Sequence, residues 1–206
     1  MPTWASGVLS GYAAPGTADE SRPILFDRIT IRPENRPATR REGNIEMAIK
    51  VGDKIPNVKL QTIRDGSIAS VWTDEFFKGK KVVLFAVPGA FTSVCSDHHL
   101  PGFIELSDHL KSRGADLVAC TAVNDLDVLK AWFKDQKVGD KVVPLADGSG
   151  DFARAMGLEL DARAFGMGVR SQRYAAVIED GVLKALNIDE PGEVARSGAS
   201  SILQSL

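Results

Sequence analysis

The stretch KVVLFAVPGAFTSVC, residues 81–95, contains the most informative feature of the chain. A short apolar run from Lys81 to Val87 is closed by a Pro-Gly pair, which is typical of a buried strand. Thr92 then offers a side-chain oxygen where a helix would begin. The stretch therefore predicts a buried strand, a tight loop and a helix whose first turn carries Cys95.

A cysteine in the first turn of a helix is placed for reactivity. The first N–H groups of a helix have no partner within the helix, and the helix dipole is positive at this end. Both effects stabilise a thiolate relative to a thiol, and the thiolate is the nucleophilic form of the side chain. Cys95 is therefore the first candidate for a catalytic residue.

Length and composition favour one globular domain with an additional tail. The 206 residues are 44% hydrophobic and 25% charged, and the net charge of −2 comes with no basic stripe interleaved with aromatic residues. We therefore expect no nucleic-acid partner. No apolar stretch approaches the roughly 20 residues that span a bilayer, and the N-terminus has no secretory signal pattern. These absences predict a protein outside the membrane with a cytoplasmic location.

The cysteines and histidines do not form a pattern typical of a metal site. The two cysteines are too few for a disulfide scaffold, and there is no Cys-x-x-Cys or Cys/His cluster with zinc spacing. His98 and His99 are close to Cys95, but adjacent helical residues point in different directions, and no third ligand follows at a suitable spacing. We therefore expect no metal and no cofactor, and interpret the two histidines as solvated or core-edge residues.

Residues 1–46 differ in character from the remainder. Prolines and glycines are scattered among small and polar residues, which predicts a disordered or weakly ordered N-terminal extension. Its acidic residues argue against an organellar transit peptide, because such peptides are poor in acids. Either the segment is a regulatory tail or translation begins at Met47, and residues 47–206 form the compact domain.

Strand and helix patterns alternate through the compact domain. Strands are predicted over 58–62, 68–71, 81–87, 116–123, 142–146, 174–179 and 182–187. Helical segments are predicted over 74–78, over 93–112 with a kink at Pro101, after a cap at Asn124, over 151–156 and over 199–206. Strand–helix–strand units followed by a hairpin and a helix predict an α/β thioredoxin-like fold with a central mixed sheet flanked by helices.

The residues around Cys95 favour chemistry on a peroxide. A thioredoxin would have Cys-x-x-Cys where this chain has Thr92-Ser93-Val94-Cys95, so a hydroxyl replaces the first thiol. A lone thiolate can attack the O–O bond of a peroxide while the hydroxyl orients the substrate, giving a sulfenic acid. The reaction also needs a cation, best an arginine, to stabilise charge on the departing oxygen.

These residues resemble a known family. The pattern Pro88-x-x-x-Thr92-x-x-Cys95 is similar to the peroxiredoxin signature, and the longer match resembles the type II (peroxiredoxin V) subfamily. The resemblance covers residues 47–206, and its remaining motifs are His99-Leu100-Pro101-Gly102-Phe103, Val118-Ala119-Cys120-Thr121-Ala122-Val123-Asn124-Asp125, Gly168-Val169-Arg170-Ser171-Gln172-Arg173-Tyr174-Ala175 and Gly181-Val182-Leu183-Lys184-Ala185-Leu186-Asn187.

The resemblance implies a thiol-dependent peroxidase for hydrogen peroxide and organic hydroperoxides. Cys95 would be the peroxidatic cysteine, Thr92 would orient the peroxide, and Pro88 would shield the site. Arg173 would be the active-site arginine, with Arg170 as its neighbour. The family also implies glutathione, glutaredoxin or thioredoxin as the reductant, and a homodimer with Phe91 at the contact.

Two departures from the family bear on how the oxidised cysteine is reduced. Residues 193–197, which match the stretch that carries a resolving cysteine in animal members, contain no cysteine, and Ser93 replaces a common proline. Cys120 follows Cys95 by 120 − 95 = 25 residues, as does the resolving cysteine of plant type II relatives. Cys120 is thus either a resolving cysteine or a small hydrophobic residue of a buried strand, and an external thiol is the favoured reductant.

Two other functions fit the same cysteine. A peroxide sensor would pass the oxidation of Cys95 to a partner without steady turnover. A cysteine hydrolase would pair Cys95 with a histidine, but the nearby histidines lie on the same helix and no third orienting group is evident.

Overall fold

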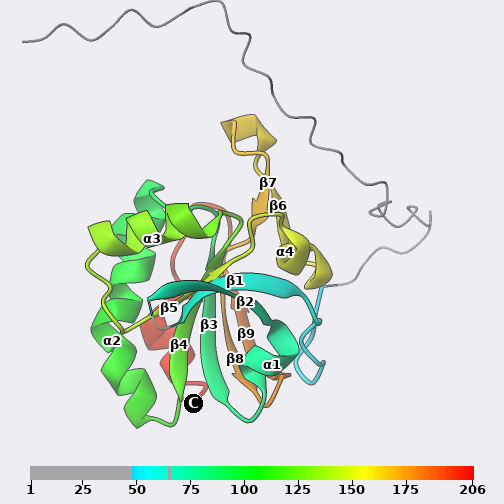
Figure 1. Ribbon diagram of the computed structural model, residues 1–206, viewed down its shortest axis with the longest axis vertical. Helices are drawn as coiled ribbons and strands as arrows, with labels where there is room; N and C mark the ends of the chain where they lie inside the picture. The colour runs from blue at the N-terminus through cyan, green and yellow to red at the C-terminus, as the bar shows by residue number, and fades with distance from the viewer. Residues whose placement is uncertain (1–47, 65) are drawn as a thin grey trace, which may run out of the picture. The chain divides into compact units, whose positions relative to one another are not determined.

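The computed structural model describes residues 48–64 and 66–206, and a mixed seven-stranded sheet forms its centre (Figure 1). The strand order is β2-β1-β5-β4-β3-β8-β9; β3, β4 and β5 are parallel neighbours, and the other pairs are antiparallel. The strands are β1 (Lys59–Arg64), β2 (Ser67–Trp72), β3 (Lys81–Val87), β4 (Leu117–Ala122), β5 (Val143–Ala146), β8 (Tyr174–Glu179) and β9 (Val182–Ile188).

Helices cover both faces of the sheet, which confirms the predicted architecture. On one face, a π-helix η1 (Cys95–His99) continues into α2 (Leu100–Ser112) and packs with α3 (Leu126–Asp135) and α5 (Ala199–Leu203). On the other face lie α1 (Thr73–Phe77) and α4 (Asp151–Ala155). In Figure 1 the first group lies to the left of and behind the sheet, and the second lies to the right.

Strand β3 is the centre of the core, because it is paired on both sides and covered on both faces. Its alternate residues divide between the two layers. Phe85 packs under η1 and α2, while Leu84 packs under α1 and α4. This double burial explains why its sequence is a continuous apolar run and not an alternating pattern, and its bounds are those predicted.

Two local predictions about helices need correction. The irregularity in the helix after Cys95 is a π-turn over Cys95–His99 that precedes Pro101, so the π-turn replaces a simple proline kink. The cap of α3 is Asp125, whose carboxylate accepts from Val128 N at 2.9 Å, and not Asn124. Asn124 instead accepts from Ala90 N at 3.0 Å and ties the loop after β3 to the end of β4.

A short hairpin between α4 and β8 was not predicted. It consists of β6 (Glu159–Asp161), a 3-10 turn η2 (Arg163–Phe165) and β7 (Val169–Ser171), and it projects from the sheet in Figure 1. Strands of three residues are too short to give a period-2 signal. We call residues 159–171 the arm, and Phe165 near its tip is 79% exposed.

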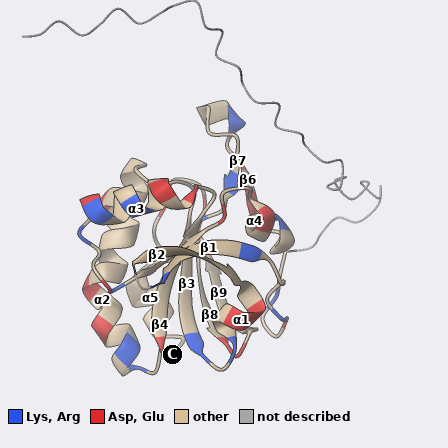
Figure 2. Cartoon of the chain, in the orientation of Figure 1, with Lys and Arg blue, Asp and Glu red and all other residues tan. Residues whose placement is uncertain are grey.

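The predicted N-terminal extension, residues 1–46, lies outside the described residues, as do Met47 and Asp65. Within the described ranges, no helix is both long enough and apolar enough to cross a bilayer. Figure 2 shows acidic and basic residues mixed along α2 and α3, while the central strands are largely tan. The charge of the described domain is therefore carried mainly at the periphery of the sheet.

Candidate active site

The ends of three strands bring the candidate residues together. Cys95 follows the loop that leaves the carboxyl end of β3, and Arg173 immediately precedes β8. Because Ala86 pairs with Tyr174 across antiparallel strands, the end of β3 lies beside the start of β8. Tyr174 in turn pairs with Ile188, so Asp189 lies beside Arg173, and Asp189 N donates to the Arg173 carbonyl at 3.0 Å. The topology of the sheet therefore builds the site.

Cys95 and Arg173 are in direct contact. Arg173 Nη2 donates to Cys95 Sγ at 3.4 Å; the cysteine is fully buried and the arginine is 5% exposed. The contact places a positive charge next to the sulfur in surroundings that largely exclude water. Arg173 Nε is buried and has no hydrogen-bond partner within the described residues.

His99 contacts the second terminal nitrogen of the same guanidinium. Arg173 Nη1 lies 3.1 Å from His99 Nδ1, and the imidazole packs edge-on against Phe85 and Phe103. Burial, with help from the charge of Arg173 and against the hydrogen bond to Ser197, lowers the pKa of His99 from 6.5 to about 4. The ring is therefore neutral at ordinary pH and can accept a hydrogen bond from Arg173.

The segment after β9 supports this histidine. His99 Nε2 lies 3.0 Å from the Ser197 carbonyl oxygen and 3.1 Å from Ser197 Oγ. The Ser197 hydroxyl donates to the Asp189 carboxylate, which also accepts from the backbone N–H groups of Ala195, Arg196 and Ser197. Although burial opposes it, this set of hydrogen bonds lowers the pKa of Asp189 and keeps the carboxylate charged.

A cavity of about 660 Å³ opens next to this group and includes both Thr92 and Pro88. Thr92 Oγ1 donates to the Gly89 carbonyl at 2.9 Å, so its hydroxyl is fixed by the loop and does not cap the helix in this conformation. Much of the remaining wall is apolar and comes from the arm and from the end of β9; it includes Leu160, Ala162, Phe165, Met167 and Ile188. The cavity thus combines a cation and a hydroxyl with an apolar wall.

Arg170 is part of the support and does not contact the sulfur. Its Nε donates to the Met167 carbonyl at 2.7 Å and its Nη1 to the Val123 carbonyl at 2.8 Å. It therefore joins the arm to the end of β4. A Cβ at Gly89 would lie 3.3 Å from both Met167 Cε and Thr92 Cγ2, so the loop passes close to the arm at this point.

Cys120 lies on β4 and is fully buried. Burial, together with the charge of Cys95, raises the pKa of the Cys120 thiol well above its ordinary value. Its surroundings therefore favour the thiol, which is the unreactive form.

The sequence missed three residues of this arrangement: His99, Ser197 and Asp189. His99 was considered only as a metal ligand or a core-edge residue, although it falls within one of the quoted motifs. No cluster of side chains among the described residues is suited to hold a metal ion. His99 is bonded to Arg173 and Ser197, so it does not form the nucleophile–base pair that a cysteine hydrolase requires.

Comparisons with known proteins agree with this geometry. The Redoxin family model matches residues 50–203. The chain is 44% identical over 166 residues to "Peroxiredoxin-2E, chloroplastic" of Arabidopsis thaliana, covering 79% of this chain and 71% of that protein. It is also 44% identical over 169 residues to "Peroxiredoxin-2E-2, chloroplastic" of Oryza sativa subsp. japonica, covering 80% and 75%.

A solved structure of a peroxiredoxin is also similar to this chain. Reduced Prx3 of Vibrio vulnificus, crystallised in complex with hydrogen peroxide, superposes with a TM-score of 0.73 at 46% identity, covering 76% of this chain and 98% of that chain. The fold is therefore thioredoxin-like, and its class is that of the thiol-dependent peroxidases. Within that class, the chain belongs to the type II peroxiredoxin family, and it is an antioxidant enzyme that reduces peroxides.

The expected cytoplasmic location is corrected by the same comparisons. Two similar relatives are chloroplastic by name, so a cytoplasmic location does not follow from family membership. The expectation was wrong because it was drawn by default from the absence of a membrane span and of a secretory signal. The acidic residues of the first 46 positions do not support it either, since a low acid content is only a compositional tendency of transit peptides.

Proposed function

We propose that Cys95 is the peroxidatic cysteine of this peroxidase. The thiolate attacks the distal oxygen of R–O–O–H, so that an S–O bond forms and the O–O bond breaks. The sulfur is oxidised to a sulfenic acid, and the departing RO⁻ takes up a proton to leave as alcohol or water. The observation that supports this role most strongly is the contact between Cys95 Sγ and the Arg173 guanidinium.

Three further residues have roles in this step. Arg173 stabilises the thiolate and the charge that develops on the departing oxygen, and its place in the cavity wall supports the second role. Thr92 orients the peroxide, and its position in the cavity wall with Arg173 supports this role. Pro88 lies in the same wall and shields the sulfur from bulk water.

The sulfenic acid is reduced by an external thiol, with glutathione, glutaredoxin or thioredoxin as the candidate reductants. A thiolate of the reductant attacks the sulfenic sulfur, so that an S–S bond forms and the S–O bond breaks, and the displaced hydroxide takes up a proton and leaves as water. A second thiol then attacks the mixed disulfide and releases Cys95 as the thiolate. The burial of Cys120 and the raised pKa of its thiol argue against an intramolecular route from β4.

We also propose that the enzyme is a homodimer with Phe91 at the contact. Phe91 is 54% exposed and has a positive φ of 61°, which is strained for an aromatic residue. The apolar ring is thus held outward beside the active-site loop. Phe91→Asp should shift the molecular mass measured by light scattering from dimer to monomer, and an unchanged dimer would reject this contact.

The domain boundary is likewise a proposal. Residues 47–206 form the catalytic domain, and residues 1–46 are an extension that turnover does not need. Support comes from the family match at residues 50–203 and from the position of every site residue after residue 87. The isolated 47–206 chain should then turn over at the rate of the full chain.

The experiment that tests the proposed roles is peroxide-dependent oxidation of a thiol donor by wild type, Cys95→Ser and Cys120→Ser. Glutathione with glutaredoxin is compared against thioredoxin. Loss of turnover in Cys95→Ser alone supports an external resolver and identifies the donor, whereas loss in Cys120→Ser as well rejects the external route. A wild type that is oxidised once without steady turnover would favour the sensor.

A further inference from the structure

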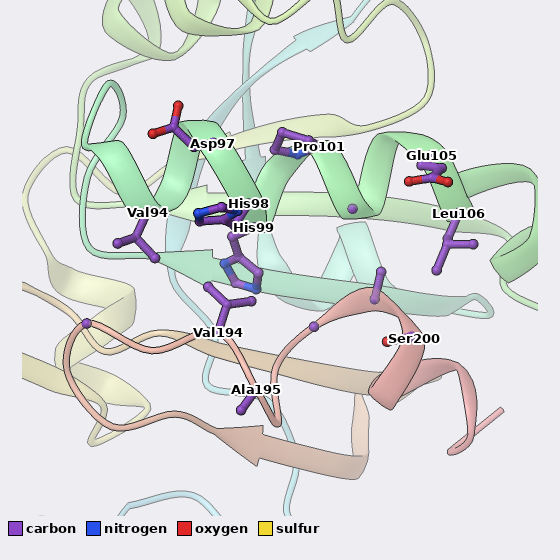
Figure 3. Close-up of a pocket in the computed structure, with 14 residues that line it drawn as sticks. Val94, Asp97, His98, His99, Pro101, Glu105, Leu106, Val194, Ala195 and Ser200 are labelled. Atoms are coloured by element: carbon purple, nitrogen blue, oxygen red, sulfur yellow. The ribbon is translucent and has the colours of Figure 1, made fainter.

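A second cavity lies beside the first, and the two share Val94 and Gly192 in their walls, while His99 lines only the second. This cavity, about 730 Å³, lies between η1 with the start of α2 and the segment after β9. Figure 3 shows Asp97 pointing away from the segment that carries Val194 and Ala195, while His99 points toward it. His98 is exposed, whereas His99 is buried. The two adjacent histidines therefore have different environments.

A continuous series of contacts runs from Asp189 to the reactive sulfur. Asp189 accepts from the Ser197 hydroxyl, Ser197 contacts His99 Nε2, and His99 Nδ1 contacts Arg173. Arg173 ends the series at Cys95 Sγ. All five residues are at most 8% exposed, so water competes little for these hydrogen bonds.

Each hydrogen bond of this series has one possible donor: Arg173 donates to His99, His99 to Ser197, and Ser197 to Asp189. A guanidinium can only donate, so His99 Nδ1 must be the acceptor and the proton of the neutral ring is on Nε2. That proton is directed at the Ser197 carbonyl and hydroxyl oxygens. The hydroxyl can accept it because its own hydrogen is donated to the Asp189 carboxylate. Each group therefore fixes the orientation of the next.

We infer that Ser197 and Asp189 are positioning residues for peroxide reduction: they hold His99 so that the Arg173 guanidinium stays against Cys95 Sγ. The inference rests on the proposed roles of Cys95 and Arg173. Ser197 is not part of the peroxide cavity wall, whereas Asp189 is. The Asp189 carboxylate is nevertheless occupied by the Ser197 hydroxyl and by the backbone N–H groups of residues 195–197. The effect of both residues on the substrate therefore passes through His99 and Arg173.

The charges around His99 agree with this role. The charged groups that act on the ring are Arg173, on the side of the sulfur, and Asp189, on the side of the segment after β9. Phe85 of β3 and Phe103 of α2 make edge-type contacts with the ring and contribute no charge. The neutral ring therefore links the position of the Asp189 side, through Ser197, to the position of the Arg173 guanidinium.

The test measures the second-order rate constant of each half-reaction separately, with hydrogen peroxide and with the thiol donor. Ser197→Ala should lower the peroxide constant about five-fold, because it removes the hydrogen bonds of the hydroxyl to His99 and to Asp189. Asp189→Asn should lower it about ten-fold, because it removes the negative charge that accepts from Ser197 and from three backbone N–H groups. The constant for the donor should change less than two-fold. Ser197→Thr keeps the hydroxyl and should recover most of the peroxide constant. The matched control is Ser201→Ala, because Ser201 donates to the Ala195 carbonyl in the same segment without reaching His99.

A double-mutant cycle separates positioning from a general loss of structure. In a His99→Phe background, adding Ser197→Ala should not lower the peroxide constant further, because the two residues act in series. Equal losses in both half-reactions, full additivity with His99→Phe, or a peroxide constant within two-fold of wild type in the folded variants would each overturn the inference. Retained turnover in Cys95→Ser would instead reject the proposed function on which it rests.

Discussion

Replacing Arg173 with lysine should reveal how much of the peroxide step depends on the geometry of its side chain and not on its charge. The guanidinium contacts two partners at once, Cys95 Sγ at 3.4 Å and His99 Nδ1 at 3.1 Å. A single ammonium keeps the positive charge but cannot reproduce a planar fork. Arg173→Lys therefore loses at least one hydrogen bond of a charged group.

The expected magnitude follows from that loss. A hydrogen bond to a charged group contributes about 1.5–3 kcal/mol, which corresponds to a decrease of about 10- to 150-fold in the rate constant for peroxide. The assay is stopped-flow reaction of the reduced enzyme with hydrogen peroxide. Arg154→Lys is the control, because Arg154 is a half-exposed cation paired with Asp151 and Glu159. A rate constant for Arg173→Lys within three-fold of wild type would refute the reasoning.

Three further predictions address the support of the site. Burial lowers the pKa of His99 from 6.5 to about 4, so the unfolded chain binds the proton more tightly than the folded chain. The contribution of His99 to the free energy of unfolding should therefore be complete above pH 6.5 and decrease by on the order of 3 kcal/mol as pH falls to 4. Urea unfolding across this range would show it, and an equal pH dependence in His99→Gln would contradict it. Gly89→Ala should lower the melting temperature, because its Cβ would lie 3.3 Å from Met167 and Thr92. Gly102→Ala within α2 should raise the free energy of unfolding by about 1 kcal/mol, because its Cβ would have no neighbour within 4 Å. A higher melting temperature in both variants would reject the close approach at Gly89. Cys120 should resist iodoacetamide at pH 8 in the native protein and react in urea, because burial raises the pKa of its thiol; mass spectrometry that finds rapid native alkylation would count against this.

The fold was predictable from the sequence where burial produces a simple pattern of apolar residues. Strand β3 is covered on both faces, so its apolar run and the Pro-Gly pair that closes it identified its bounds. The hairpin of β8 and β9 followed from Asp180-Gly181, both of which have positive φ. The arm was missed because strands of three residues carry no periodic signal.

The site was predictable only in part, for a physical reason. Cys95, Thr92 and Pro88 share one loop, so local spacing identified them, and Arg173 was found by resemblance. His99 and Ser197 are 98 positions apart in the sequence and meet only because the segment after β9 folds back onto η1. A single serine or aspartate after a strand has no pattern that distinguishes it from a surface residue. Asn124 was misassigned for a related reason: its side chain binds the distant loop at Ala90 and not its own helix.

The most direct test of the central claim is to trap the first oxidised product. The reduced enzyme is mixed with one equivalent of hydrogen peroxide and a sulfenic-acid reagent such as dimedone, then digested and analysed by mass spectrometry. We expect one adduct per chain, at Cys95, with Cys120 unmodified and no adduct in Cys95→Ser. An adduct at Cys120, or peroxide consumption that continues in Cys95→Ser, would contradict it.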